Sequence, residues 1–210
     1  MIDAFQGGSE SNSWTVLGHT AGGPFTFKGG NRYTDTFDIA SSASFDLPDL
    51  LFLLTNIDGV SIDSVKVDSD VVDDTSVLKI VGAEQRRGGT WHVLGAGAPA
   101  LVRAGTSATL RLRYAGGGHG PSFQLKVPAR AAGMSGRLFA SEVDSFPFER
   151  GFPRTLAGVK RLAQNAHRND QARVEFFAFG GRTKPVESQL FTQPGQKVVT
   201  GRTVLKVKVS

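Results

Sequence analysis

Side chains that commonly carry catalysis or bind metals are scattered through this sequence of 210 residues. The four histidines lack the short spacings that join two ligands of a zinc site, because they stand far apart at His19, His92, His119 and His167. The segment Gly133-Met134-Ser135-Gly136 lacks the outer glycine of a G-x-S-x-G nucleophile elbow. The chain contains no Cys, which excludes disulfides, thiolate catalysis and Cys-ligated metals. We therefore predict that the chain is not an enzyme and needs no cofactor.

One group of carboxylates has the chemistry of a calcium site. Carboxylate oxygens are the ligands that this hard cation prefers, and four of them follow one another closely, at Asp68, Asp70, Asp73 and Asp74. Their spacing does not fit the EF-hand loop. Aspartates that alternate along a strand are also typical of its solvent-exposed face. The sequence leaves both interpretations open, a calcium site and a solvated strand.

The distribution of charge is strongly uneven along the chain. Residues 1–85 carry 13 Asp and Glu against 4 Lys and Arg, whereas residues 86–210 carry 6 against 20, so their net charges are −9 and +14. Opposite charges would let the two parts attract each other; alternatively, the basic part presents a surface to an acidic polymer. The residues expected to form this binding surface are Arg86, Arg87, Trp91, Arg111, Arg113, Tyr114 and Lys126.

Several ligand classes are compatible with that surface. A protein partner or an anionic polymer of the cell envelope fits a basic region whose Lys and Arg are interleaved singly along strands. A carbohydrate would need an exposed ring for stacking, supplied by Trp91, Tyr114 or Trp14. Nucleic acid is not expected, because the chain has neither an RNA-recognition sequence nor a helix-turn-helix. We predict a non-catalytic interaction module that binds a protein or an anionic envelope polymer.

The elements that would position these residues are mostly strands. Residues 100–128 contain two alternating segments joined by a glycine-rich turn, and this period of two predicts a half-buried β-hairpin. The residues that share the apolar faces of its strands are Leu110, Leu112 and Tyr114, then Phe123, Leu125 and Val127. Further short strands between residues 60 and 140 are separated by Gly, Pro and Asp turns. They predict a mainly β fold, an antiparallel β-sandwich like those of immunoglobulin and fibronectin type III domains.

Two short helices interrupt this pattern. Asp46 begins the first helix, and its leucines recur at helical spacing until Gly59. Thr155 caps the second helix, which ends near Asn165. We therefore expect a flexible leader with short strands in residues 1–30 and a sandwich with one helix in residues 31–140. Residues 141–210 would form a small α+β subdomain, in which the second helix packs with C-terminal strands.

Several spaced motifs are similar to a known family. They are Asn31-Arg32-Tyr33, Phe37-Asp38-Ile39-Ala40, Asp63-Ser64-Val65-Lys66-Val67, Val102-Arg103-Ala104-Gly105, Lys126-Val127-Pro128 with Gly133, and His167-Arg168-Asn169-Asp170. Over residues 30–172 they resemble the region that follows the protease domain in actinobacterial proteins related to the stage IV sporulation serine peptidases. The family's catalytic serine lies in a Ser-Gly-Ser-Pro-like segment, which this chain lacks. The resemblance therefore implies a non-catalytic accessory region whose catalytic domain lies outside this chain.

The location of the protein is indicated only indirectly. No run of apolar residues reaches the roughly 18 that a membrane span needs, and the N-terminal residues have neither the basic nor the apolar region of a signal peptide. The resemblance implies an exported or cell-envelope protein of a bacterium, and a chain without Cys agrees with that setting. We expect no membrane span and no metal-dependent chemistry beyond the calcium alternative.

Overall fold

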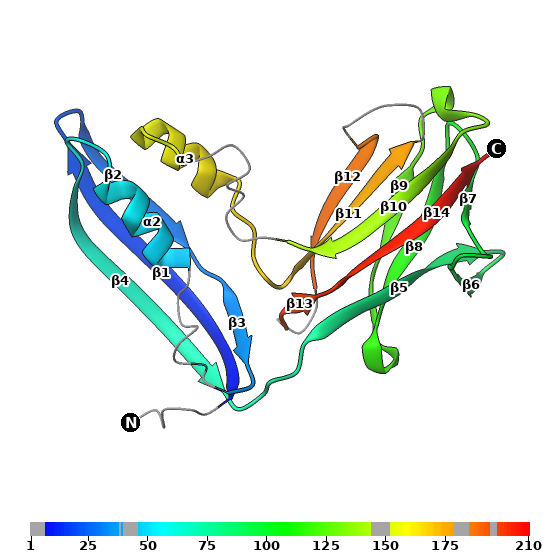
Figure 1. Ribbon diagram of the computed structural model, residues 1–210, viewed down its shortest axis with the longest axis horizontal. Coiled ribbons are helices and arrows are strands. Elements are labelled where there is room, and N and C mark those ends of the chain that lie inside the picture. The colour runs from blue at the N-terminus through cyan, green and yellow to red at the C-terminus, as the bar shows by residue number, and fades with distance from the viewer. Residues whose placement is uncertain (1–6, 38, 40–45, 144–151, 179–184, 194–196) are drawn as a thin grey trace. The chain divides into compact units, whose positions relative to one another are not determined.

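Figure 1 shows the computed structural model, which describes residues 7–37, 39, 46–143, 152–178, 185–193 and 197–210. The chain folds into two compact units. Unit 1 contains Met1–Ser76 and Val143–Asp170, and unit 2 contains Val77–Glu142 and Gln171–Ser210. The divisions between the units follow Ser76, Glu142 and Asp170, and none falls at residue 30. The reason is that one long strand before residue 30 pairs with a strand well after it, which joins both to unit 1.

Unit 1 is built on a four-stranded antiparallel sheet. Its central strand, β1 (Gly8–Thr20), pairs along one edge with β2 (Gly23–Gly29) and β3 (Arg32–Asp35), and along the other with β4 (Ser61–Val72). Alternate residues of a strand face opposite sides, so Trp14 and Val16 are buried whereas Ser13 and Leu17 are exposed. With 13 residues, β1 is longer than the short strands expected in this region.

Both predicted helices are present, and both belong to unit 1. They are α2 (Asp46–Thr55) and α3 (Leu156–Gln164). The hydroxyl of Thr155 accepts a hydrogen bond from the backbone N of Gly158 at 3.1 Å, which confirms the predicted cap. The helices bury their apolar residues against the sheet in one core, whose members include Trp14, Val16, Phe25, Phe27, Leu50, Leu54 and Val159.

Unit 2 contains two five-stranded sheets. One has the order β12-β11-β10-β14-β7, and the other has the order β13-β5-β8-β9 with β6 paired to β5. Neighbouring strands run antiparallel except in the pairs β7–β14 and β5–β13, which are parallel. The strands are β5 (Leu78–Arg87), β6 (Thr90–Val93), β7 (Ala100–Val102), β8 (Ser107–Tyr114), β9 (His119–Lys126), β10 (Ser135–Glu142), β11 (Gln171–Ala178), β12 (Glu187–Thr192), β13 (Val199–Thr200) and β14 (Arg202–Val209).

The predicted hairpin lies at one edge of the second sheet, where β8 is an internal strand and β9 is the edge strand. β8 and β9 pair antiparallel, with Leu110 opposite Phe123, and glycines 116–118 make the turn between them. Both sheets contribute to a single hydrophobic core, which includes Leu110, Leu112, Leu138, Phe176 and Val207. Over the described residues the fold is therefore mainly β, with two helices and sheets that are mostly antiparallel, as the sequence predicts. Among the described residues, no helix is both long enough and apolar enough to cross a membrane.

Candidate functional site

Most of the predicted binding residues meet on one face of the sheet that contains β5, β6, β8 and β9. The pairing places Arg86 opposite Trp91 and Glu84 opposite Arg111. Arg113 lies two residues beyond Arg111 and therefore on the same face. We define the basic face by the outward-facing residues Arg86, Trp91, Arg111, Arg113, His119 and Lys126, arranged around Glu84.

Glu84 organises the centre of the basic face. Its buried carboxylate accepts a hydrogen bond from Arg111 Nε at 2.7 Å. Arg113 Nε lies 3.8 Å away and His119 Nε2 lies 3.4 Å away from the same carboxylate. On its other side, the Arg111 guanidinium stacks 4.2 Å from the centre of the Trp91 ring, a cation–π contact. A buried acceptor and an aromatic ring thus fix the position of Arg111.

Two predicted residues do not belong to this face, and the expectation of an exposed side chain is wrong for Tyr114. Tyr114 is 3% exposed and lies in the core with Leu110 and Leu112. It follows Arg113 directly, so the pleat of the strand must point the two side chains in opposite directions. Arg87 likewise follows Arg86, and its guanidinium donates to Gln85 Oε1 and to the carbonyl of Pro99, each at 2.8 Å. Neither is placed to hold a ligand on the basic face.

Two of the three aromatic rings considered for carbohydrate stacking are buried. Tyr114 and Trp14 are 3% and 5% exposed, so neither offers a flat surface to a sugar. Trp91 is partly exposed, but Arg111 stacks on its ring. The structure therefore removes two of the three rings on which this alternative depended.

The aspartates considered for calcium lie on β4 and just after it. Asp68 pairs with Lys66 at 2.9 Å, and the carboxylate of Asp74 accepts a hydrogen bond from the backbone N of Ser76 at 2.8 Å. Asp68 and Asp70 are both exposed. Within the residues that the structure describes, no group of three or more His, Asp or Glu side chains is arranged to hold a metal ion. These observations favour the solvated strand.

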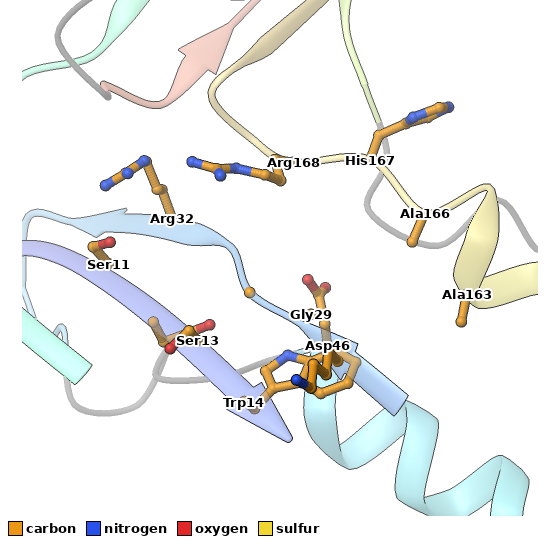
Figure 2. A pocket seen from close by; sticks show the side chains of 13 residues that line it. Ser11, Ser13, Trp14, Gly29, Arg32, Asp46, Ala163, Ala166, His167 and Arg168 are labelled. Atoms are coloured by element: carbon orange, nitrogen blue, oxygen red, sulfur yellow. The ribbon is translucent and has the colours of Figure 1, made fainter. Parts of the chain in front are cut away.

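A pocket in unit 1 was not predicted. Figure 2 shows that it lies where β1 meets the connection from β2 to β3 and the segment after α3. Its volume is about 490 Å³. The lining side chains that carry charge or a ring are Trp14, Lys28, Arg32, Asp46, His167 and Arg168. We call this cavity the unit 1 pocket.

Asp170 holds the two arginines of this pocket in place. Its carboxylate is fully buried and accepts hydrogen bonds from Arg32 Nε at 3.1 Å and from Arg168 Nη2 at 2.6 Å. In Figure 2 the side chains of Arg32 and Arg168 lie at the same end of the pocket. The two guanidinium groups thus share one counter-charge, which leaves an excess of positive charge at this end.

Asn31 fastens the segment after α3 to the sheet. Its Nδ2 donates to Asp46 Oδ2 at 2.6 Å, and its Oδ1 accepts from the backbone N of Asn169 at 2.6 Å. The backbone N of Asn31 donates in turn to Asn12 Oδ1 at 3.0 Å. Hydrogen bonds therefore join four separate stretches of sequence in the wall of the pocket, around residues 12, 31, 46 and 169.

The sequence contained the parts of this pocket without the information that they meet. Asn31-Arg32-Tyr33 and His167-Arg168-Asn169-Asp170 stood there only as separate motifs of the resemblance, apart from the mention of His167 among the histidines. The ion pair that joins Arg32 to Asp170 spans 138 residues, beyond the reach of any local pattern. Comparison with protein-family models, with curated proteins and with solved structures finds no match. The geometry of the two sites is therefore the basis for assigning a function.

Proposed function

We propose that this chain is a non-catalytic binding module whose basic face takes an anionic polymer. Unit 2 carries 16 Lys and Arg against 4 Asp and Glu, a net charge of +12, whereas unit 1 has a net charge of −7. The observation that carries the proposal is the arrangement at Glu84. A single buried carboxylate and the Trp91 ring hold Arg111 in place, while Arg113 and His119 lie beside the same carboxylate.

The spread of positive charge favours a polymer over a small anion. Lys126 lies opposite Ser107, and Arg113 lies six residues further along β8 from Ser107. Strand residues advance about 3.4 Å each, so these two cations stand roughly 20 Å apart along one face. A repeating chain of phosphates or carboxylates can reach both positions at once. Restraining Arg111 in advance also lowers the entropy that binding would otherwise cost.

We also propose a sandwich architecture for unit 2 and a location at the cell envelope. The two five-stranded sheets of unit 2 share one core, which supports a sandwich of the immunoglobulin or fibronectin type III kind. Such sandwiches commonly serve as rigid scaffolds for binding surfaces. We infer that the polymer is an anionic constituent of a bacterial cell envelope, and that the protein is exported to reach it.

Salt-dependent retention tests the proposal. The purified chain is applied to immobilised lipoteichoic acid and eluted with a NaCl gradient. Polyanion binding through Lys and Arg releases counter-ions, so affinity should fall steeply as salt rises. Replacing Arg111 and Arg113 by Gln should lower the elution salt and reduce the slope of log affinity against log salt by about two.

A matched variant separates the face from the total charge. Lys206 and Lys208 are exposed on β14, in the other sheet of unit 2. Their double replacement by Gln removes the same charge and should leave retention nearly unchanged. An equal loss of retention in both double variants would mean that the net charge of the chain, and not the basic face, determines binding. Double-stranded DNA and an uncharged dextran, immobilised in parallel, show whether the envelope polymer is preferred.

A further inference from the structure

Two buried donors in the unit 1 pocket have no acceptor among the described residues. They are Asn12 Nδ2 and Trp14 Nε1, and the two residues are 7% and 5% exposed. Buried polar groups in folded proteins nearly always have a partner, because an unmade hydrogen bond costs free energy. Both residues line the pocket. The fold thus leaves two donors without an acceptor in residues that line the pocket.

The two donors belong to one strand and face the same way. Asn12 and Trp14 are two residues apart on β1, and both alternate with exposed or half-buried neighbours. Residues with this spacing stand about 6.8 Å apart along a strand. One ligand with two acceptor oxygens could be reached by both side chains. Asn12 is oriented for this, since its Oδ1 is already engaged by the backbone N of Asn31 at 3.0 Å.

The pocket that holds these donors is rich in positively charged residues, although unit 1 as a whole is negatively charged. Unit 1 has a net charge of −7 and holds only eight Lys and Arg. Three of the eight line this one pocket: Lys28, Arg32 and Arg168. Arg32 and Arg168 are fixed by Asp170, whereas Lys28 is exposed and has no carboxylate within 4.0 Å among the described residues. Asp46 also lines the pocket, so three cations face one carboxylate in its lining. In Figure 2, Trp14 lies beside Asp46, and Arg32 and Arg168 lie at the other end.

We propose that the unit 1 pocket binds a small oxyanion, a carboxylate or a phosphate group. Its oxygens accept hydrogen bonds from Asn12 Nδ2 and Trp14 Nε1, and its charge is balanced by Lys28 with the Arg32–Arg168 pair. The volume of 490 Å³ lies within the range of small-molecule sites. This site lies in unit 1, uses none of the residues of the basic face and does not depend on polymer binding.

The indole N–H signals of an ¹⁵N-labelled sample test this site directly. The chain has two Trp residues, so two indole signals are expected, and the Trp91→Phe variant assigns them. Sodium phosphate and sodium acetate are titrated in separate arms to about 10 mM, a range that detects millimolar affinity, with NaCl holding the ionic strength constant. The Trp14 signal should shift and saturate while the Trp91 signal stays in place. The arm that saturates at lower concentration identifies phosphate or carboxylate as the preferred group.

Two variants connect the shift to the proposed contacts. Asn12→Asp keeps an oxygen acceptor for Asn31 and replaces the Nδ2 donor by a charged oxygen that repels the anion, so binding should weaken at least tenfold. Lys28→Gln changes an exposed residue and should weaken binding several-fold without affecting the fold. Lys66→Gln, on β4 and outside the pocket lining, is the matched control and should bind like the natural chain.

Defined outcomes would overturn the proposal. The first is no saturable shift of the Trp14 signal in either arm. Another is an equal shift of both indole signals, which would mean a general salt effect. The last is undiminished binding by Lys28→Gln and by Asn12→Asp, with circular dichroism showing that both are folded. If Asn12→Asp does not fold, the comparison of Lys28→Gln with Lys66→Gln decides.

Discussion

Arg32 and Asp170 form an ion pair of 3.1 Å between residues that stand 138 positions apart in the sequence. The Asp170 side chain is fully buried, and the Arg32 side chain is 12% exposed. Asp170 ends the second stretch of unit 1, and Arg32 begins β3 in the first. The two stretches are therefore joined by a charged contact in addition to the apolar core that α2 and α3 share.

The Asp170→Asn variant should strongly destabilise unit 1. It removes the charge that neutralises Arg32 and Arg168 while leaving both guanidinium groups in place. Removing one partner of a buried ion pair typically costs about 3 to 5 kcal/mol, because the other charge stays buried without compensation. Urea unfolding followed by Trp14 fluorescence in a Trp91→Phe background would report this loss. Asp68→Asn, which breaks the exposed pair with Lys66, should change stability by less than about 1 kcal/mol.

The Gly29→Ala variant should disturb the packing of Trp14. A Cβ added to Gly29 would overlap the six-membered ring of that indole, which has buried surroundings and little room to move. Overpacking of this kind typically costs about 1 to 3 kcal/mol. We expect lower stability and a shifted emission maximum for Trp14. Gly22→Ala is the control, since its Cβ would meet only the hydroxyl of Thr20 at 3.5 Å; an equal loss in both variants would contradict the steric explanation.

The two tyrosines of the chain should stay protonated well above the ordinary titration range. Burial raises the pKa of Tyr114, and burial together with the nearby Asp46 carboxylate raises the pKa of Tyr33. The folded state then holds these protons more tightly than the unfolded state. Their contribution to stability is complete below about pH 10, the ordinary tyrosine pKa, and is lost as the pH rises beyond it. Absorbance at 295 nm should show a midpoint near 10 in urea and a clearly higher one in the folded chain.

Replacing each tyrosine by Phe should have opposite consequences. The Tyr33 hydroxyl accepts a hydrogen bond from the backbone N of Asp46 at 3.1 Å, so Tyr33→Phe leaves that donor without this acceptor. The Tyr114 hydroxyl has no partner among the described residues, so Tyr114→Phe removes a polar atom that is buried without compensation. We expect a loss of about 1 to 2 kcal/mol for the first and none, or a gain, for the second. Thermal unfolding of the two variants side by side measures the difference.

Structural elements that depend on residues close together in the sequence could be predicted. The alternation of Leu110 and Leu112 with arginines placed β8 correctly, and Thr155 with the apolar stripe of α3 placed that helix. The same alternation places Tyr114 in the core, which conflicts with its assignment to a binding surface, and the structure resolves the conflict in favour of burial. Period-two arguments should therefore be applied to every candidate residue of a strand.

Contacts between distant stretches could not be predicted in this way. Much of β1 is Ser, Gly and Asn, residues with low preference for strands, and it is held by its pairing with β4 some 50 positions later. The unit 1 pocket depends on the same kind of contact, because Asn31 reaches Asn169 only after the chain has passed through unit 2. Hydrogen bonds between side chains and a distant backbone produce no periodic pattern in the sequence. The pocket could therefore not be predicted from the sequence.

Glu84→Gln should strengthen binding of the polymer. Glu84 carries the one negative charge at the centre of the basic face, where Arg111, Arg113 and His119 surround it. Glutamine keeps an oxygen that can accept the hydrogen bond from Arg111 Nε, so the arginine stays oriented while the face gains one unit of positive charge. Elution from immobilised lipoteichoic acid should then need more salt than for the natural chain, whereas Arg111→Gln needs less. If Glu84→Gln elutes earlier instead, the fixed geometry of Arg111 would matter more for binding than the charge of the face, because the ion pair with Glu84 is what holds that arginine most closely.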